Sequence, residues 1–449
     1  MSFKKKLMAG VGYTAGGQLI TYGVRFIGNL VLARLLAPDL FGLMLVGYTF
    51  TYAASLLTDI GSRSAIIQDA RADDSNYRDS VWTMYFLRGI VVALFVSAMT
   101  GFIWYLQSMG FVNPTSTYAD PRLLLVLPLL ALAEFIRCFE SIEVLYRERV
   151  LDFRALFIFN GSKQFVNTFA AIVWAWLDPG VVGLCAGGII AQLFGAVLSY
   201  SWMNGQPPKL VWRPDDFLYI LQQGKWVLVS SGLTFLVNSA DRVIMALQLD
   251  AVQMGLYSMA LTLGLLAQDF AYKLGTTVVF PGISHRIREG VTDVSRDYYR
   301  MRRLFEYLAI GSGFTLILLG NEIIELLYPA QYGGAGPVLQ VLGFVALLVA
   351  YMPSQDAYAG MGEFKKASLV NLVRLVSMVL ALLVLVPALG IVGGAWSLVV
   401  SALCSTLAMF WCNHLLGLLR WREELRLLSW FAIGFVVAGA VEAWRRGMF

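Results

Sequence analysis

Twelve stretches of mostly apolar residues, each long enough to cross a lipid bilayer as a helix, follow one another along this chain. A membrane-spanning helix needs about 20 consecutive apolar residues, so this pattern predicts an all-α integral membrane protein. Only 14% of the residues are charged, against about 25% in an ordinary soluble domain. The predicted spans are residues 11–36, 40–67, 79–106, 122–146, 154–177, 180–202, 222–247, 254–281, 303–320, 335–361, 366–387 and 391–417. A thirteenth stretch, residues 427–444, is short, and we expect either a span or an interfacial helix there.

Basic residues gather in every second turn between the predicted spans. The turns around residues 147–154 and 286–303 are rich in arginine, whereas the turn at 321–336 is acidic. Lys4, Lys5 and Lys6 would lie on the same side as the basic turns. Because short cytoplasmic loops carry the excess of Lys and Arg, the sequence predicts a multi-pass protein with a cytoplasmic N-terminus.

One short sequence pattern returns 213 residues later in the chain. Residues Leu36–Leu43 are echoed by Leu249–Leu256, and Gly61 is then echoed by Gly275. Related halves are a common plan among transporters. We therefore predict an N-terminal six-helix lobe over residues 1–203, a cytoplasmic linker over 204–222, a C-terminal six-helix lobe over 223–417 and a tail over 418–449.

Several classes of function are excluded by what the chain contains. The predicted turns are too short for a catalytic or nucleotide-binding domain, and no phosphate-binding GxxxxGK[ST] motif is present. The four cysteines lie in apolar stretches without paired spacing, and there are only two histidines. We predict no catalytic residue, no metal site and no cofactor, so the chain is not expected to be an enzyme.

Polar and charged residues recur inside the predicted spans, where a charge at mid-membrane costs about 2.5–3.5 kcal/mol on insertion scales. Local pairing explains part of this pattern, since Glu134, Arg137 and Glu140 can pair with one another and Asp269 can pair with Lys273. The alternative is a water-filled cavity with an excess of positive charge, suited to phosphate oxygens. The predicted cavity cations are Arg25, Arg88, Lys163, Lys273 and Arg374; the predicted polar cavity residues are Gln18, Tyr22, Asn29, Tyr48, Tyr52 and Asn238; and the acids that could bind a coupling proton or sodium ion are Asp59, Asp241 and Asp269.

Several segments resemble a known family in the same order and spacing. These segments are ARLLAPDLFGL with DIGSRSAIIQ, then NSADRVIMALQLDAVQMGLYSMA, YPAQYGGAGPVLQVLG and AYAGMGEFKKASLVNLVRLV. They resemble the polysaccharide flippases of the MOP superfamily (the Wzx type), which supply O-antigen and exopolysaccharide synthesis. The resemblance implies two six-helix lobes related by a pseudo-twofold axis around a central cavity that opens alternately to either side of the bacterial inner membrane.

The resemblance also implies a substrate and partners. Such proteins flip a polyprenyl-diphosphate-linked oligosaccharide from the cytoplasmic to the periplasmic leaflet, and the resemblance implies polysaccharide polymerase and chain-length proteins as partners. On this basis we expect Arg25 and Lys273 to hold the diphosphate, and Asp269 to be a protonation site. A multidrug exporter or lipid II flippase of the same superfamily is the alternative, and a membrane polysaccharide polymerase is disfavoured by the short periplasmic turns.

Overall fold

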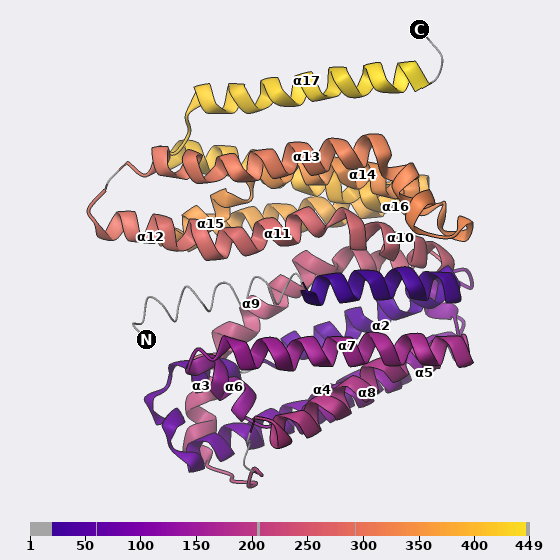
Figure 1. Cartoon of the computed structure of the whole chain (residues 1–449), viewed down its shortest axis with the longest axis vertical. Helices are drawn as coiled ribbons and strands as arrows, with labels where there is room; N and C mark the ends of the chain where they lie inside the picture. Colours follow the sequence, from indigo (N-terminus) through magenta and orange to yellow (C-terminus); the bar gives the residue numbers. More distant parts are fainter. Residues whose placement is uncertain (1–19, 60, 204–206, 292, 446–449) are drawn as a thin grey trace. The chain divides into compact units, whose positions relative to one another are not determined.

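The computed structural model describes residues 20–59, 61–203, 207–291 and 293–445, and every regular element in these ranges is a helix (Figure 1). The predicted all-α class is therefore confirmed. The chain divides into two compact units, residues 1–236 and 237–449, with the division inside one long helix, α9 (Pro214–Ala246). Within the described ranges, six helices are long and apolar enough to cross a membrane, or seven if one bent pair is a single span. The protein is thus a multi-pass membrane protein.

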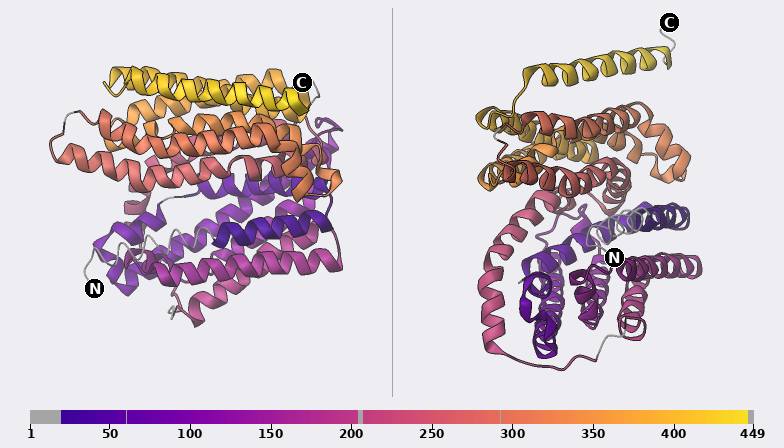
Figure 2. Two further views of the ribbon diagram at one scale, coloured as in Figure 1. Left: turned by 45° about the horizontal axis from the view of Figure 1, so that its top comes forward. Right: turned by 60° about the vertical axis from the view of Figure 1, so that its left-hand side comes forward.

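The first unit consists of helices that lie alongside one another (Figure 2). After a helix over residues 20–35, it contains α2 (Pro38–Leu57), α3 (Ser62–Gln68), η1 (Ala70–Asp73), α4 (Ser75–Ser108), η2 (Thr117–Ala119), α5 (Leu123–Arg137), α6 (Glu143–Arg149), α7 (Phe153–Leu177), α8 (Val181–Ser201) and most of α9.

Helix α2 begins where the sequence predicts, but it ends early. Ala37 is extended and Pro38 occupies the first turn, where its missing N–H costs nothing. The helix ends at Leu57, and the chain then turns through Gly61, which has a φ of 86°. The predicted span over residues 40–67 is therefore wrong in its last third, because a left-handed residue cannot continue an α-helix. Asp59 lies in this turn, where its Oδ1 accepts a hydrogen bond from the Gly61 N–H at 2.9 Å.

The end of α3 is held by an arginine from α6. The Arg149 guanidinium donates to the carbonyl oxygens of Ile66 and Asp69 at 3.0 and 2.6 Å. The Asp69 carboxylate accepts from Arg71, and this hydrogen bond lowers the pKa of Asp69 to about 2.

Because α5 ends at Arg137 and α6 is a separate short helix, the predicted single span over residues 122–146 is also broken.

The second unit contains the end of α9 and the remaining helices. These are α10 (Ala251–Gly264), α11 (Leu266–Leu274), the π-helical turn η3 (Gly275–Val279), α12 (Phe280–Arg288), α13 (Ser295–Leu327), η4 (Ala330–Tyr332), α14 (Ala335–Leu348), η5 (Val349–Tyr351), α15 (Pro353–Gly360), α16 (Phe364–Leu415) and α17 (Trp421–Arg445).

One predicted span of this unit is bent, and another contains a 3₁₀ turn. Residues 254–281 form α10, α11, η3 and the start of α12 in place of one straight helix, with a bend of 42° between α10 and α11. Residues 335–360 remain a single candidate span, in which the 3₁₀ turn η5 connects α14 to α15, so the predicted span over residues 335–361 is confirmed. Breaks of this kind free backbone groups within a span, and they are tolerated in membrane proteins where protein surrounds them.

The segment α16 consists of two antiparallel helices. Gly390 has non-helical angles (φ 59°, ψ −135°) in its middle. The Ser401 hydroxyl donates to the Arg374 carbonyl oxygen at 2.7 Å. In one straight helix these two residues would lie about 40 Å apart, so the chain must reverse between them. This agrees with the predicted pair of spans over residues 366–387 and 391–417.

The tail forms one helix, α17, which lies against α13 (Figures 1 and 2). Near its start Glu424 contacts Arg302 of α13, and further along Phe435 contacts Phe314 of α13, with ring centroids 5.2 Å apart. Both helices advance by a similar number of residues between the two contacts, so they run in the same direction. Helix α17 therefore follows a candidate span over about 16 Å of its length.

Candidate functional site

A polar cavity of about 340 Å³ lies within the first unit. Its wall comes from the helix over residues 20–35 and from α2, α5, α7 and α8. The lining residues are Thr21, Tyr48, Thr51, Leu130, Ala133, Glu134, Asn160, Lys163, Gln164, Asn167, Gly188, Ala191 and Gln192. The four α7 residues recur at steps of three or four, so they share one helix face.

The charged groups of this cavity are neutralised inside the unit. The Lys163 ammonium donates to the buried Glu140 carboxylate. Arg137 Nη1 lies 3.2 Å from Glu134 Oε2, which confirms part of the predicted local pairing. Lys163 is therefore not an unpaired cavity cation, because its partner comes from the segment after α5.

Arg88 of α4 is held by neutral groups. Its guanidinium donates to the Ser55 carbonyl oxygen at 2.6 Å and to the Ser55 hydroxyl at 3.0 Å. Its Nε points at the Thr58 hydroxyl at 3.4 Å. These groups surround the end of α2, where the last carbonyls have no helical partner, and a cation there stabilises the helix terminus.

Arg25 is the predicted cation with the fewest constraints in this unit. It is exposed and makes no ion pair in the part of the chain that the structure describes. Thr21, which lines the cavity, lies one turn before it on the same helix face. Tyr48, also in the cavity wall, lies in the electrostatic field of both Arg25 and Glu134.

The other predicted polar residues of the first unit are dispersed. Tyr48 is 50% exposed and Tyr52 is 41% exposed; the Tyr52 ring lies 6.4 Å from that of Phe235. Tyr22 is exposed and Asn29 is partly buried. Tyr22 and Asn29 do not line the cavity described above, whereas Tyr48 does. The predicted residue Gln18 lies outside the described ranges.

In the second unit, Asp241 has a structural partner. It is 4% exposed, and its Oδ2 accepts a hydrogen bond from the Tyr257 hydroxyl at 2.7 Å. Arg374 is partly buried, makes no ion pair within the described ranges, and is attracted electrostatically by Asp241. Asn238, one helical turn before Asp241, is exposed.

Lys273 and Asp269 lie together on α11, just before the π-helical turn. Both are exposed, and Lys273 forms no ion pair in the described residues. Gly275 begins the π-helical turn, and a Cβ atom added there would lie 1.9 Å from Asp356 Oδ2 of α15. The Asp356 carboxylate thus packs directly against the glycine backbone.

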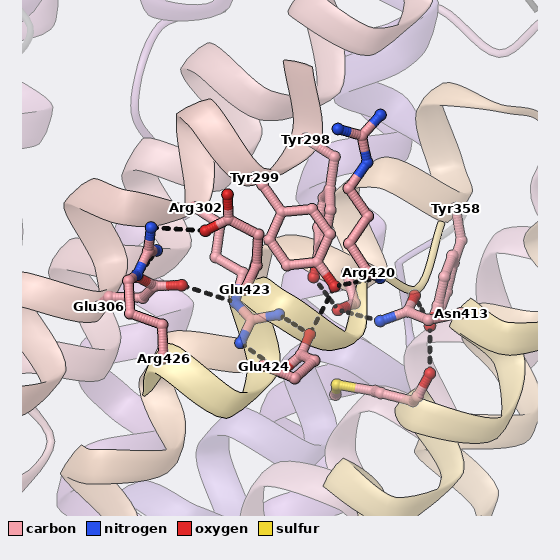
Figure 3. Close-up of polar contacts among 12 residues, drawn as sticks. Tyr298, Tyr299, Arg302, Glu306, Tyr358, Asn413, Arg420, Glu423, Glu424 and Arg426 are labelled. Carbon is pink, nitrogen blue, oxygen red and sulfur yellow. Dashed lines mark hydrogen bonds and ion pairs between the residues drawn. The ribbon is translucent and has the colours of Figure 1, made fainter. Parts of the chain in front are cut away.

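The densest charge network of the second unit joins α13 to α17 (Figure 3). Arg302 is fully buried, with its Nη2 2.9 Å from Glu424 Oε2 and its Nε 3.3 Å from Glu306 Oε1. The Tyr299 hydroxyl donates to Glu424 at 2.6 Å, and Arg426 donates to Glu306 at 2.8 Å. This network fastens the tail helix to the bundle.

Two residues that sequence reasoning did not single out belong to these sites. Gln192 of α8 lines the cavity, and its buried Oε1 has no hydrogen-bond partner within the described residues. Asp356 contacts the helix break at Gly275. Gln192 recurs with Gly188 at a helical step of four, and Asp356 is an acid within a predicted span. Either signal could have marked them.

Cavities between membrane helices together with broken spans are typical of transporters, and comparisons with known proteins agree. Residues 31–336 match the family "Polysaccharide biosynthesis protein". This match covers more than half of the chain, and the chain belongs to that family.

Two curated relatives have names that point to the same biology. The chain is 22% identical over 352 residues to the lipopolysaccharide biosynthesis protein WzxC of Escherichia coli, covering 78% of this chain and 68% of the relative. It is 20% identical over 339 residues to the succinoglycan biosynthesis transport protein ExoT of Rhizobium meliloti, covering 75% of this chain and 66% of the relative.

Solved structures show the same fold. An inward-facing multidrug resistance MATE transporter of the MOP superfamily has a TM-score of 0.68 at 14% identity, covering 92% of this chain and 95% of that chain. The lipid II flippase MurJ in an inward closed conformation has a TM-score of 0.66 at 12% identity, covering 95% and 92%. These proteins are transporters, and the expectation that the chain is not an enzyme agrees with them.

Proposed function

We propose that this protein flips a polyprenyl-diphosphate-linked oligosaccharide repeat unit from the cytoplasmic to the periplasmic leaflet for surface polysaccharide synthesis. The observation that carries this proposal is the match to a polysaccharide biosynthesis family over residues 31–336 in a chain with the fold of MOP-superfamily transporters. The diphosphate and sugars would cross through protein while the lipid tail stays in the bilayer.

We further propose two six-helix lobes with the N-terminus in the cytoplasm of a bacterial inner membrane, and α17 as a thirteenth span. The alternation of basic turns supports the orientation. The contact between α13 and α17 supports a membrane-spanning α17. Helix α17 runs in the same direction as the candidate span α13 and stays in contact with it beyond the charged residues at the start of α17.

Arg25 in the first unit and Lys273 in the second are our proposed diphosphate-binding cations. Each is exposed, and neither is neutralised by an ion pair in the described residues. A cation that is not paired with a carboxylate can bind phosphate oxygens. Arg88 and Arg374 are weaker candidates, because the first already donates to Ser55 and the second is partly buried.

A coupling ion, either a proton or sodium, is proposed to act through Asp269. Asp269 is exposed on α11, one helical turn before Lys273 and close to the π-helical turn, where the span is already bent. If Asp269 carries the coupling proton, Asp269→Asn should change the pH dependence of transport. Unchanged pH dependence would reject this role. Cooperation with a polymerase or chain-length protein also remains part of the proposal.

Deletion of the gene in its host tests the function directly. We expect loss of one surface polysaccharide and accumulation of its lipid-linked repeat unit on the cytoplasmic side. An intact polymer with lost drug resistance would support an exporter, and arrested peptidoglycan synthesis would support a lipid II flippase, as the two structural neighbours suggest. Repeat units that reach the periplasm but stay unpolymerised would point to a polymerase.

The proposed cations are tested in the same deletion strain. Arg25→Ala and Lys273→Ala should each reduce the surface polymer at normal protein levels. Arg34→Ala is the matched control for the first, because Arg34 is exposed on the same helix and lies nine residues away, on the opposite face. Full polymer production by both variants would contradict the assignment.

A further inference from the structure

The cavity of the first unit has an unusual balance of groups for a protein that handles a diphosphate. Its charges cancel: Lys163 pairs with Glu140, and Arg137 pairs with Glu134. The other polar groups that line the cavity are neutral: hydroxyl groups from α2 and the helix over residues 20–35, and carboxamides from α7 and α8. A neutral cavity is a poor site for a multiply charged anion.

Carboxamides suit a different part of the substrate. An amide offers both a donor and an acceptor, as does a sugar hydroxyl, so the two can form paired hydrogen bonds. Three amides line the cavity with capacity to spare: Asn160, Asn167 and Gln192. Gln164 is partly used, because its Nε2 donates to the Thr168 hydroxyl at 3.1 Å.

Gln192 is the most informative of these amides. Its Oε1 is buried and accepts no hydrogen bond from the described residues. A buried acceptor without a donor costs about 1–3 kcal/mol, so a rotation of the Gln192 amide that turns this oxygen toward the cavity and a ligand hydroxyl would remove that cost. Tyr48, half-exposed in the same wall, adds an aromatic ring and a hydroxyl.

Size and position define which part of the substrate fits. A volume of about 340 Å³ lies at the lower end of the roughly 300–1,000 Å³ of ligand pockets, so the cavity holds a small ligand and not a whole oligosaccharide. Thr21 in its wall lies one helical turn, about 6 Å along the axis, from Arg25. A sugar in the cavity could therefore be the one bonded directly to a diphosphate held by Arg25.

We propose that this cavity is a neutral glycan subsite that recognises the sugar attached to the diphosphate, with Asn160, Asn167 and Gln192 as specificity-determining residues. This inference rests on the proposed function and assigns the diphosphate and the sugar to different residues. Arg25 binds the charge that every lipid-linked repeat unit carries, and the amides distinguish the sugar that differs between repeat units.

Binding to the purified full-length protein tests the subsite with two probes. One probe is farnesyl diphosphate, which has the charge and no sugar; the other is the lipid-linked saccharide extracted from the host. The wild-type protein should bind the saccharide more tightly. The double variant Asn167→Leu/Gln192→Leu should lose roughly tenfold in saccharide affinity and keep its affinity for farnesyl diphosphate.

Control variants separate the subsite from the function. Gln68→Leu removes an exposed amide of α3 away from the cavity and should change neither affinity. Arg25→Ala should weaken binding of both probes. If the double variant binds both probes as the wild type does, the glycan subsite is wrong while the transporter proposal stands. If the wild-type protein binds neither probe, the proposed function itself fails.

Discussion

The two units use charge within the bundle in different ways. In the first unit, Lys163 and Glu140 pair beside a polar cavity, so charge helps to shape a hollow space. In the second unit, Arg302 and Glu424 pair in a packed interior between α13 and α17, where they join two helices. Both arrangements remove charges from lipid, but only the first leaves polar groups free beside the pair.

This difference bears on the two related halves that the sequence predicts. The halves start alike, since α2 begins at Pro38 and α10 begins after Asp250, at matching positions of the repeated pattern. The second unit then continues into the tail helix α17, and the buried Arg302 joins this helix to α13. A charge inside the bundle therefore marks a substrate site only where it lines a cavity or lacks a partner.

The largest expected effect comes from breaking the buried network. Arg302→Met removes the cation shared by Glu424 and Glu306, which are 1% and 5% exposed, and leaves Glu424 with the neutral Tyr299 hydroxyl in place of a charged partner. Removing one member of a buried ion pair costs about 3–5 kcal/mol, so we expect a large fall in the unfolding temperature in detergent. Arg303→Met, which removes a half-exposed arginine beside it, should change little.

A double replacement sharpens this test. Arg302→Met/Glu424→Met removes both charges of the closest pair and should recover part of the lost stability, since apolar groups of similar size often replace a buried pair without loss. Equal stability of Arg302→Met and Arg303→Met would contradict the idea that this network holds α17 in place.

The next effect separates stability from transport within the first unit. Lys163→Met strands the buried Glu140 carboxylate and should lower the free energy of unfolding by about 3 kcal/mol. Arg25→Ala should leave stability nearly unchanged and reduce transport. The unfolding midpoint in detergent and the surface polymer are both measured. Adding Glu140→Gln to Lys163→Met should restore stability, and failure to do so would contradict the pairing.

The sequence predicts the class of this protein and one wall of its cavity, because both depend on local periodicity. Asn160, Lys163, Gln164 and Asn167 fall on one face of any helix over that stretch, and the structure places all four in the cavity wall. The ion-pair partner of Lys163 is not predicted in the same way. Glu140 precedes it by 23 residues on a separate segment, and only the packing brings them together.

The breaks in the predicted spans could not be found from hydropathy for a similar reason. Residues 58–67 mix apolar residues with Asp59 and Arg63, so hydropathy leaves the end of this span open, whereas α2 ends at Leu57, before Gly61 with its positive φ. In the second unit, the turn at Gly275 remains helical but widens to a π-helix. Hydropathy records burial in lipid or protein and is insensitive to backbone angles.

The third effect compares these two breaks. A Cβ at Gly275 would meet the Asp356 carboxylate, so Gly275→Ala should cost about 1–3 kcal/mol of overpacking. Gly61→Ala should cost about 1 kcal/mol for a different reason, the left-handed backbone at a φ of 86°. Unfolding in detergent measures both losses.

Second substitutions distinguish the two causes. Asp356→Ala removes the clash and should recover stability in Gly275→Ala only. Gly61→Asn should be tolerated better than Gly61→Ala, because asparagine adopts the left-handed region more readily. If Asp356→Ala does not improve Gly275→Ala, the carboxylate is not what fills the space at this break.

The smallest effect compares two loop carboxylates, one in each unit, by their dependence on pH. Arg71 lowers the pKa of Asp69 from 3.8 to about 2, and Ser295, with Arg420, lowers the pKa of Asp293. A carboxylate with a lowered folded-state pKa stabilises the protein above its unfolded pKa, and this stability is lost as the pH falls from about 4 toward 2. Because solvent screens Arg71, which is about half exposed, we expect a loss of about 1 kcal/mol. Between pH 5 and pH 2, the free energy of unfolding of Asp69→Asn should fall less than that of the wild type. Asp293→Asn should reduce this fall by a smaller amount, because the Asp293 carboxylate is more exposed than that of Asp69. The reverse order would mean that the turn after α3 is not held by its Asp69–Arg71 pair.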